Sequence, residues 1–236
     1  MKILITIFLL LASQVHADVL SENNFTLRAG FSFNLNHIET DRLIDNSETE
    51  DDGKLEDETK TFGYGLVTSI AYKFNDWEFA FASDVLFGKI KDVSFIYQES
   101  SIRGGGHFRL VSIGPQIKYH TPYTIFNKAT VYVGVGPSWS LQTFVFKNPY
   151  YTGNFNDKRR VSFENYGGGI FIGLQEIQAV KENHPMFIEV GYSYMHSYKV
   201  SLLDSTDSAD VITLSEGDSN DFSGQYLFIR AGFTLF

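Results

Sequence analysis

Residues 24–36 read Asn-Phe-Thr-Leu-Arg-Ala-Gly-Phe-Ser-Phe-Asn-Leu-Asn, and from Phe25 onward every second position is apolar. The positions between them carry polar or small side chains. Successive side chains of a β-strand point to opposite faces, so this stretch predicts a strand with one apolar face. It is longer than the roughly 5–6 residues of an ordinary globular strand.

The same two-residue period recurs in seven further segments, of which the glycine-rich 166–174 shows it least clearly. The segments are 62–74, 77–88, 111–119, 131–142, 166–174, 188–194 and 226–235. Their connections alternate between short (75–76, 121–128, 181–185) and long (37–60, 92–106, 148–160, 204–221). Transmembrane barrels combine short periplasmic turns with long extracellular loops. We therefore predict an all-β fold, an eight-stranded antiparallel up-and-down transmembrane β-barrel.

The orientation of the two faces separates this barrel from a soluble, lipocalin-like barrel with an apolar lumen. A soluble barrel needs an outer face dense in Lys, Glu, Gln and Thr, whereas the non-apolar face here is mostly Gly, Ala and Ser. Small residues fit the narrow interior of eight strands. Facing lipid near mid-membrane, Arg28 and Arg230 would each cost about 2–4 kcal/mol. We predict that the large apolar side chains face lipid.

The N-terminus has the pattern of a secretory signal peptide, residues 1–17. Lys2 supplies the positive start, Ile3 to Ala12 the apolar run, and Val15-His16-Ala17 the cleavage site. The run is too short to span a membrane as a helix. The alternative, a buried N-terminal helix, lacks capping residues and amphipathicity. The expected organisation is a signal peptide followed by a single barrel domain, 18–236.

Composition excludes several classes of protein. The 236 residues contain no cysteine, which rules out disulfides, thiolate metal sites and cysteine nucleophiles. Asp+Glu number 28 against 19 Lys+Arg, a balance that argues against nucleic acid as a partner. Aromatic residues make up 16% of the chain, which argues against disorder.

With its signal peptide, eight alternating segments, short–long loop order and terminal Phe236, the chain resembles the small outer-membrane barrels of Gram-negative bacteria, of the OmpX and OmpA-transmembrane-domain type. The resemblance implies a place in the cell outer membrane, among its lipids and lipopolysaccharide. It also implies assembly by periplasmic chaperones and the barrel-insertion machinery. The C-terminal insertion signal of such families falls on Phe233, Leu235 and Phe236. The chain departs from that pattern, because Thr234 stands where an aromatic is common and Phe233 lies one place off.

Charged residues lie on the face that is expected to point into the lumen. The set comprises Arg28, Lys73, Glu78, Asp84, Lys118, Glu189 and Arg230. A buried charge is costly unless it is paired and hydrogen-bonded, so we expect a lumen charge network, in which Lys73 and Glu78 could face each other across the turn at 75–76. The network could act as a gate in a narrow polar pore or as a plug. The packed interiors of the barrels that the chain resembles imply the plug.

An enzyme at the membrane rim would need converging Ser, His and acid groups. His196-Ser197 is the best candidate, but adjacent strand residues point to opposite faces and cannot form a nucleophile–base pair. His107 and His120 have no obvious acid partner at strand spacing. No catalytic residue, cofactor or metal site is therefore predicted.

Two loops carry contrasting charge. Residues 39–58 contain ten acids, and Glu48 to Gly53 superficially resembles a calcium loop, but Thr59 stands where the bidentate acid belongs. A solvated loop is favoured and Ca²⁺ binding stays open. Lys158, Arg159 and Arg160 lie near Tyr150 and Tyr151, and could contact lipopolysaccharide phosphates.

The sequence thus favours a non-enzymatic outer-membrane barrel with a packed polar lumen. Its role would be structural, or surface recognition and adhesion through long extracellular loops whose ligand is unknown. The alternative is a narrow channel or an OmpW-like conduit for small or apolar molecules. A lipid-modifying enzyme at the rim is a third hypothesis.

Overall fold

The computed structural model describes residues 24–38, 60–97, 100–125, 129–155, 157–177, 185–204, 209–213 and 224–235. The signal peptide, the acidic segment 39–58 and Phe236 lie outside them. The described strands are β1 (Phe25–Ile38), β2 (Lys60–Phe74), β3 (Trp77–Tyr97), β4 (Ser100–Ile125), β5 (Ala129–Phe146), β6 (Tyr150–Thr152), β7 (Lys158–Ile177), β8 (Met186–Asp204), β9 (Ala209–Thr213) and β10 (Gly224–Thr234).

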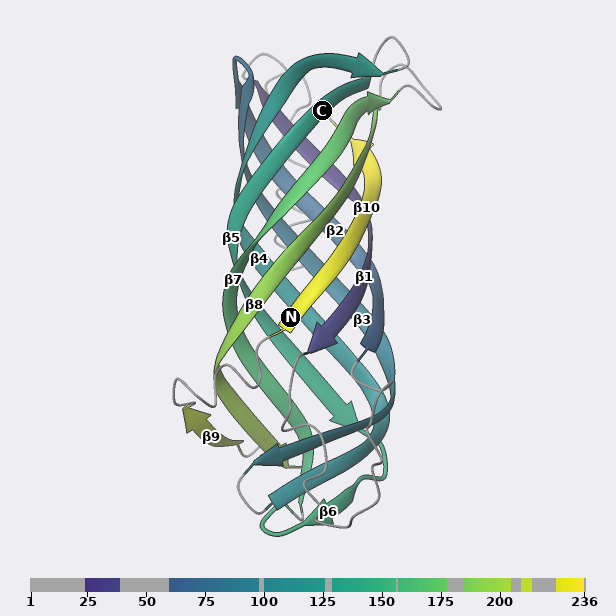
Figure 1. Cartoon of the computed structure of the whole chain (residues 1–236), viewed down its shortest axis with the longest axis vertical. Helices are drawn as coiled ribbons and strands as arrows, with labels where there is room; N and C mark the ends of the chain where they lie inside the picture. The colour runs from purple at the N-terminus through teal and green to yellow at the C-terminus, as the bar shows by residue number, and fades with distance from the viewer. Residues whose placement is uncertain are drawn as a thin grey trace, which may run out of the picture.

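Eight of these strands close into a ring, shown in Figure 1, in which every neighbouring pair is antiparallel. The ring closes because β10 pairs both with β1 and with β8. The short strands β6 and β9 pair with β4 and β8 outside this ring. The predicted eight-stranded antiparallel up-and-down barrel is confirmed.

The two faces of the wall have the predicted orientation. On β1, Phe31 is 62% exposed on the outside while its neighbour Ser32 is fully buried in the lumen. The same alternation exposes Leu66, Phe79, Val135, Ile170 and Leu227 on the other strands. A soluble barrel with an apolar lumen and a polar exterior is therefore wrong, and the wall is built to contact lipid.

Within the described residues, no helix is long and apolar enough to span a bilayer.

The two ends of the barrel differ. The short-turn end carries the tight turn at Asn75–Asp76, where Asn75 takes a left-handed backbone (φ 54°). The long-loop end, with β6 and β9 at the bottom of Figure 1, extends beyond β1, β2 and β10 because β3, β4, β5, β7 and β8 continue there.

The predicted loop 92–106 is wrong, since β3 and β4 stay paired from Val93↔Gly104 to Tyr97↔Ser100. A register shift between Ile90 and Val93 breaks the alternation that marks a strand in sequence. The predicted loops 148–160 and 204–221 are also partly strand, because they contain β6, the start of β7 and β9.

The wall has an interrupted seam halfway along β4 and β5. Gly114-Pro115 faces Gly136-Pro137, and the described β4–β5 ladder passes from Ile113↔Trp139 directly to Ile117↔Val135. Proline has no N–H to donate, so both strands lose a donor at the same level. The carbonyl oxygens of the prolines instead approach the facing glycines, where a Cβ on Gly114 would lie 2.1 Å from the oxygen of Pro137.

Candidate functional site

The lumen is filled in three successive layers, of which the layer nearest the short-turn end is charged. Its six ionised side chains are all at most 5% exposed: Arg28, Glu78, Asp84, Lys118, Glu189 and Arg230. Alternation places each of them on the inward face of its strand.

Glu78 is the first junction of this layer. The guanidinium of Arg28 donates two hydrogen bonds to its carboxylate, one of them from Nη2 to Oε2 at 2.7 Å. Nε2 of His120 lies 3.1 Å from the same Oε2, and Nζ of Lys118 lies 3.6 Å from Oε1. Arg28 is held further by Oε1 of Gln175, which accepts a bond from Nη2 at 2.9 Å.

Glu189 is the second junction. Its carboxylate accepts hydrogen bonds from Nζ of Lys118 at 2.7 Å and from the Tyr132 hydroxyl at 2.8 Å. It also accepts a longer bond, 3.3 Å, from Arg230, whose Nε and Nη2 reach Asp84 at 3.1 and 2.5 Å. Three cations and three carboxylates therefore form one continuous chain, in which each buried charge has an opposite partner.

Aromatic rings cover the cations of this layer. The guanidinium of Arg230 lies 4.0 Å from the centre of the Phe228 ring. Nζ of Lys118 lies 5.1 Å from the ring of Tyr132 and 5.4 Å from that of Phe171. Such contacts attract the cations to the rings, because the ring face is electronegative.

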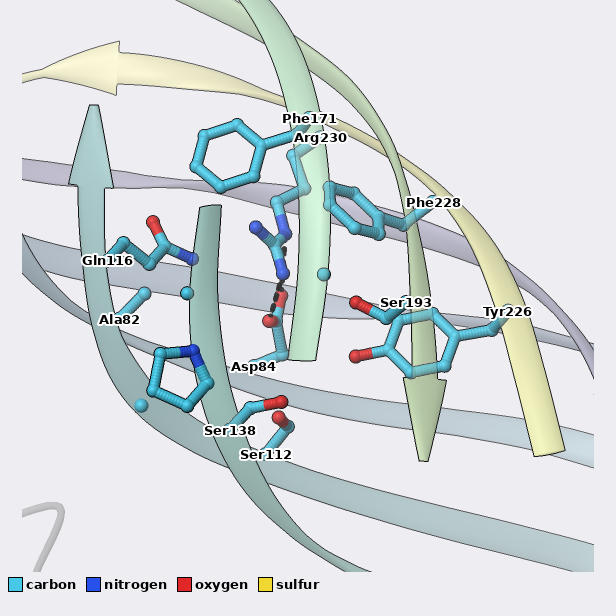
Figure 2. Close-up of a pocket in the computed structure, with 14 residues that line it drawn as sticks. Ala82, Asp84, Ser112, Gln116, Ser138, Phe171, Ser193, Tyr226, Phe228 and Arg230 are labelled. Atoms are coloured by element: carbon cyan, nitrogen blue, oxygen red, sulfur yellow. Dashed lines mark hydrogen bonds and ion pairs between the residues drawn. The ribbon is translucent and has the colours of Figure 1, made fainter. Parts of the chain in front are cut away.

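The second layer combines small polar side chains with the buried rings of Phe171, Tyr226 and Phe228. Figure 2 shows Arg230 reaching Asp84 beside Phe171 and Phe228, with Ser112, Ser138, Ser193 and Tyr226 around the space beyond. The cavity that they line measures about 30 Å³. That volume is enough for one or two waters but not for a hydrated ion or a larger solute.

The third layer, towards the long-loop end, is an apolar cluster. We call it the apolar plug; it comprises Leu86, Ile90, Val93, Phe95, Ile102, Phe108, Leu110, Phe144, Phe146, Phe155, Val161, Phe163, Val200 and Leu202. All of its members are at most 9% exposed. The predicted packed polar lumen describes only part of the interior, because the third layer is apolar.

The predicted network residues do not all meet. Arg28, Glu189 and Arg230 join the chain through Glu78, Lys118 and Asp84. Lys73 lies opposite Glu78 in the β2–β3 register, but the ion pairs of Glu78 among the described residues go to Arg28, Lys118 and His120. The expectation that His120 lacks an acid partner is wrong, and its position two residues after Lys118, on the same face, was the available signal.

His196 and Ser197 point to opposite sides of the wall, as alternation requires. The His196 ring packs against Tyr166 at 5.0 Å between centroids on the outer face. The Ser197 hydroxyl donates to Oδ1 of Asn165 at 2.5 Å inside the lumen. Within the described ranges, no three His, Cys, Asp or Glu side chains are grouped as metal ligands would be.

The predicted lipopolysaccharide contacts are split by the fold. Lys158 pairs with Asp210 of β9 at 2.5 Å, Arg159 is exposed, and Arg160 lies on the outer face of β7 opposite Val145. Sequence reasoning missed a wider set of basic residues, which we call the basic row: Lys89, His107, Arg109 and Arg160. Register pairs align Lys89 with His107 and His107 with Val145, and Arg109 lies over the Phe87 ring at 5.6 Å.

The C-terminal strand presents Phe233 and Leu235 on the outer face, each 39% exposed. Phe233 pairs with Ala29 at the closure of the barrel, and the N–H of Leu235 donates to the carbonyl of Leu27.

No family model and no curated protein sequence matches the chain. Among solved structures, the chain is similar to Neisserial surface protein A, with 15% identity, coverage of 90% of this chain and 97% of that one, and a TM-score of 0.46. It is similar to the attachment invasion locus protein Ail of Yersinia pestis, with 14% identity, coverage of 89% and 97%, and a TM-score of 0.39. It is also similar to the outer-membrane protease OmpT of Escherichia coli, with 9% identity, coverage of 90% and 96%, and a TM-score of 0.38.

Proposed function

We propose that the protein resides in the cell outer membrane as a sealed, non-enzymatic barrel whose role is carried by its extracellular end. The observation that carries this proposal is the filling of the lumen by the charged layer and the apolar plug in series. With the short-turn end in the periplasm, the long-loop end projects from the cell surface.

Transport along the barrel axis would have to break both layers. A permeating ion would compete with the buried pairs around Glu78 and Glu189, and would then lose its hydration among the apolar plug residues. The cavity of about 30 Å³ between the layers gives it no aqueous path. The packing therefore supports a plug over a gate or conduit.

Conductance tests this proposal directly. Purified, folded protein inserted into planar bilayers is expected to produce no stepwise currents, and Glu189→Ala is expected to produce none either, because the apolar plug remains. Stepwise currents from the wild-type barrel at modest voltage would refute the sealed lumen. Heat-modifiable gel mobility provides the check that the inserted protein is folded.

A surface role is supported by the strands that extend beyond β1, β2 and β10. The apolar plug packs beneath them, and Phe155, next to β6, stacks on Phe95 at 5.9 Å between centroids. An extension with its own buried core presents a fixed shape, which suits recognition or adhesion better than a loop without packing does.

We propose lipopolysaccharide as one partner, held at the outer face by the basic row together with Arg159. Lysine and arginine bind phosphate through charge-assisted hydrogen bonds. Replacement of Lys89, Arg109 and Arg160 by alanine is expected to lower lipopolysaccharide affinity about tenfold, since three exposed contacts at about 0.5 kcal/mol each add to about 1.5 kcal/mol. The exposed Lys147, outside the row, provides the control Lys147→Ala. Unchanged affinity of the triple variant in a vesicle-binding assay would contradict the contact.

A further inference from the structure

The lipid-facing wall is not uniform. Over β1, β2 and β3 it carries large aromatic side chains, among them Phe31, Phe33, Phe62, Tyr64, Phe79 and Phe81. Over β5, β7 and β8 the exposed side chains near the short-turn end are shorter and aliphatic, among them Val133, Val135, Ile170, Ile172 and Val190. The short side chains leave a depression in the outer surface.

This depression is a groove of about 730 Å³, which we call the wall groove. Two consecutive rows of outward side chains line it: Trp77, Tyr119, Val133, Ile172 and Val190 in one, and Ile117, Val135, Ile170, Tyr192 and Leu227 in the next. It crosses the strands rather than following one of them. Its volume falls in the range of about 300–1,000 Å³ that is typical of ligand pockets.

Glycine backbone forms part of the groove. Gly134 and Gly191 line it, and the lumen ring of Phe171 presses on Gly134 from behind, where a Cβ would lie 2.2 Å from that ring. Gly191 is backed in the same way by the Phe228 ring, 2.4 Å from the Cβ position. The absence of side chains and the packed rings behind give the groove a fixed apolar floor.

One end of the groove lies at the short-turn end of the barrel. Trp77 directly follows the Asn75–Asp76 turn and packs on Tyr119 at 5.0 Å between ring centroids. Tryptophan and tyrosine favour the membrane–water interface, so this end opens at the interface on the short-turn side. In the proposed orientation this is the periplasmic leaflet, whose lipids are phospholipids.

We infer that the wall groove binds one acyl chain of a phospholipid of the periplasmic leaflet as a resident ligand. The inference rests on the proposed membrane orientation. The surrounding lipid is as apolar as the groove, so escape from water cannot make an acyl chain prefer the groove to the bilayer. Its preference for the groove must come from contact with a fixed apolar surface. A flexible alkyl chain can follow the aliphatic rows from the Trp77–Tyr119 pair towards Leu227, and the lining offers it dispersion contacts along both sides.

The two tryptophans of the chain allow a direct test. Trp77 lines the groove, whereas Trp139 is 53% exposed elsewhere on the outer wall, opposite Ile113. Trp139→Phe leaves Trp77 as the reporter, and Trp77→Phe leaves Trp139 as the control. Each variant is reconstituted with rising fractions of a phosphatidylethanolamine carrying brominated acyl chains, which quench indole fluorescence on contact. Half-maximal quenching of Trp77 is expected at a brominated-lipid fraction about fivefold below that for Trp139.

The second arm of the quenching experiment uses variants that fill the wall groove. Val135→Phe with Ile170→Phe, in the Trp139→Phe background, is expected to raise the half-quenching fraction of Trp77 to that of Trp139. Leu66→Phe on β2 is the matched control, because it adds an aromatic ring to the wall outside the groove. All these side chains face lipid, and heat-modifiable mobility verifies folding.

Three outcomes would overturn the resident chain. They are equal quenching of Trp77 and Trp139, a Trp77 curve unchanged by the two filling substitutions, and a dimer in sedimentation that those substitutions abolish. Absence of quenching at both tryptophans in folded protein would instead refute the membrane placement itself, so the two failures are distinguishable.

Discussion

Replacement of Glu189 by alanine is expected to lower the free energy of unfolding by about 3–5 kcal/mol, the usual cost of breaking a buried ion pair by removing one partner. Lys118 loses its 2.7 Å contact, Arg230 loses one of its two carboxylates, and the Tyr132 hydroxyl loses its acceptor. All three groups remain buried, with one positive charge in excess. Urea titration in lipid vesicles, followed by tryptophan fluorescence and gel mobility, measures the change.

A matched carboxylate on the outer face provides the control. Glu164 pairs with Lys199 at 2.6 Å, but both side chains are about one-third exposed, at 34% and 33%. Glu164→Ala is therefore expected to cost at most about 1 kcal/mol. If the two variants unfold with equal losses, Glu189 is not the junction of a desolvated network. Glu189→Gln should fall between them, since an amide oxygen can still accept from Tyr132 while the charge is lost.

The barrel itself could be predicted because lipid on one side and a narrow lumen on the other impose a strict period of two. Phe31 and Ser32 occupy adjacent positions and opposite environments for this reason alone. The same period identified the inward charges, since Arg28, Glu78 and Glu189 interrupt faces that are otherwise made of small residues. Local sequence carries that information without any knowledge of the ring.

Partner choice in the network could not be predicted in the same way. Glu78 lies opposite Lys73 across a tight turn, yet it binds Arg28, fifty positions away in sequence. Which cation reaches Glu78 depends on the closure of β1 against β10 and on the direction of each long side chain. Neither of these can be read from the periodicity of the sequence. His120, near the C-terminal end of β4, belongs to the same cluster.

The predicted loop at residues 92–106 is wrong because local irregularity interrupts the two-residue period of its strands. A register shift interrupts the alternation in β3, and three consecutive glycines, Gly104, Gly105 and Gly106, follow in β4. Residues 92–106 therefore have the composition of a loop. In the fold this segment places Val93, Phe95 and Ile102 in the apolar plug. Its apolar residues are buried by strands distant in sequence, and burial of that kind cannot be read from a window of ten residues.

The apolar plug makes Phe163 the second position of large expected effect. Its ring meets Phe95 edge-on at 5.9 Å and Phe144 at 5.8 Å between centroids, and only 4% of it is exposed. Phe163→Ala is expected to lower the free energy of unfolding by about 3–5 kcal/mol, because transfer energy is lost and the ring leaves a cavity that close packing prevents from collapsing fully.

Tyr150 is the control for this variant, since it lies at the same end and is 80% exposed, and Tyr150→Ala is expected to change stability by at most about 0.5 kcal/mol. The extended strands β3 and β4 should also become more sensitive to protease in Phe163→Ala, because the plug holds them together at the long-loop end. A Phe163→Ala variant that matches Tyr150→Ala in both stability and protease resistance would mean that the plug is not the core of the extension. In that case the fixed surface on which the recognition role depends would have no structural basis.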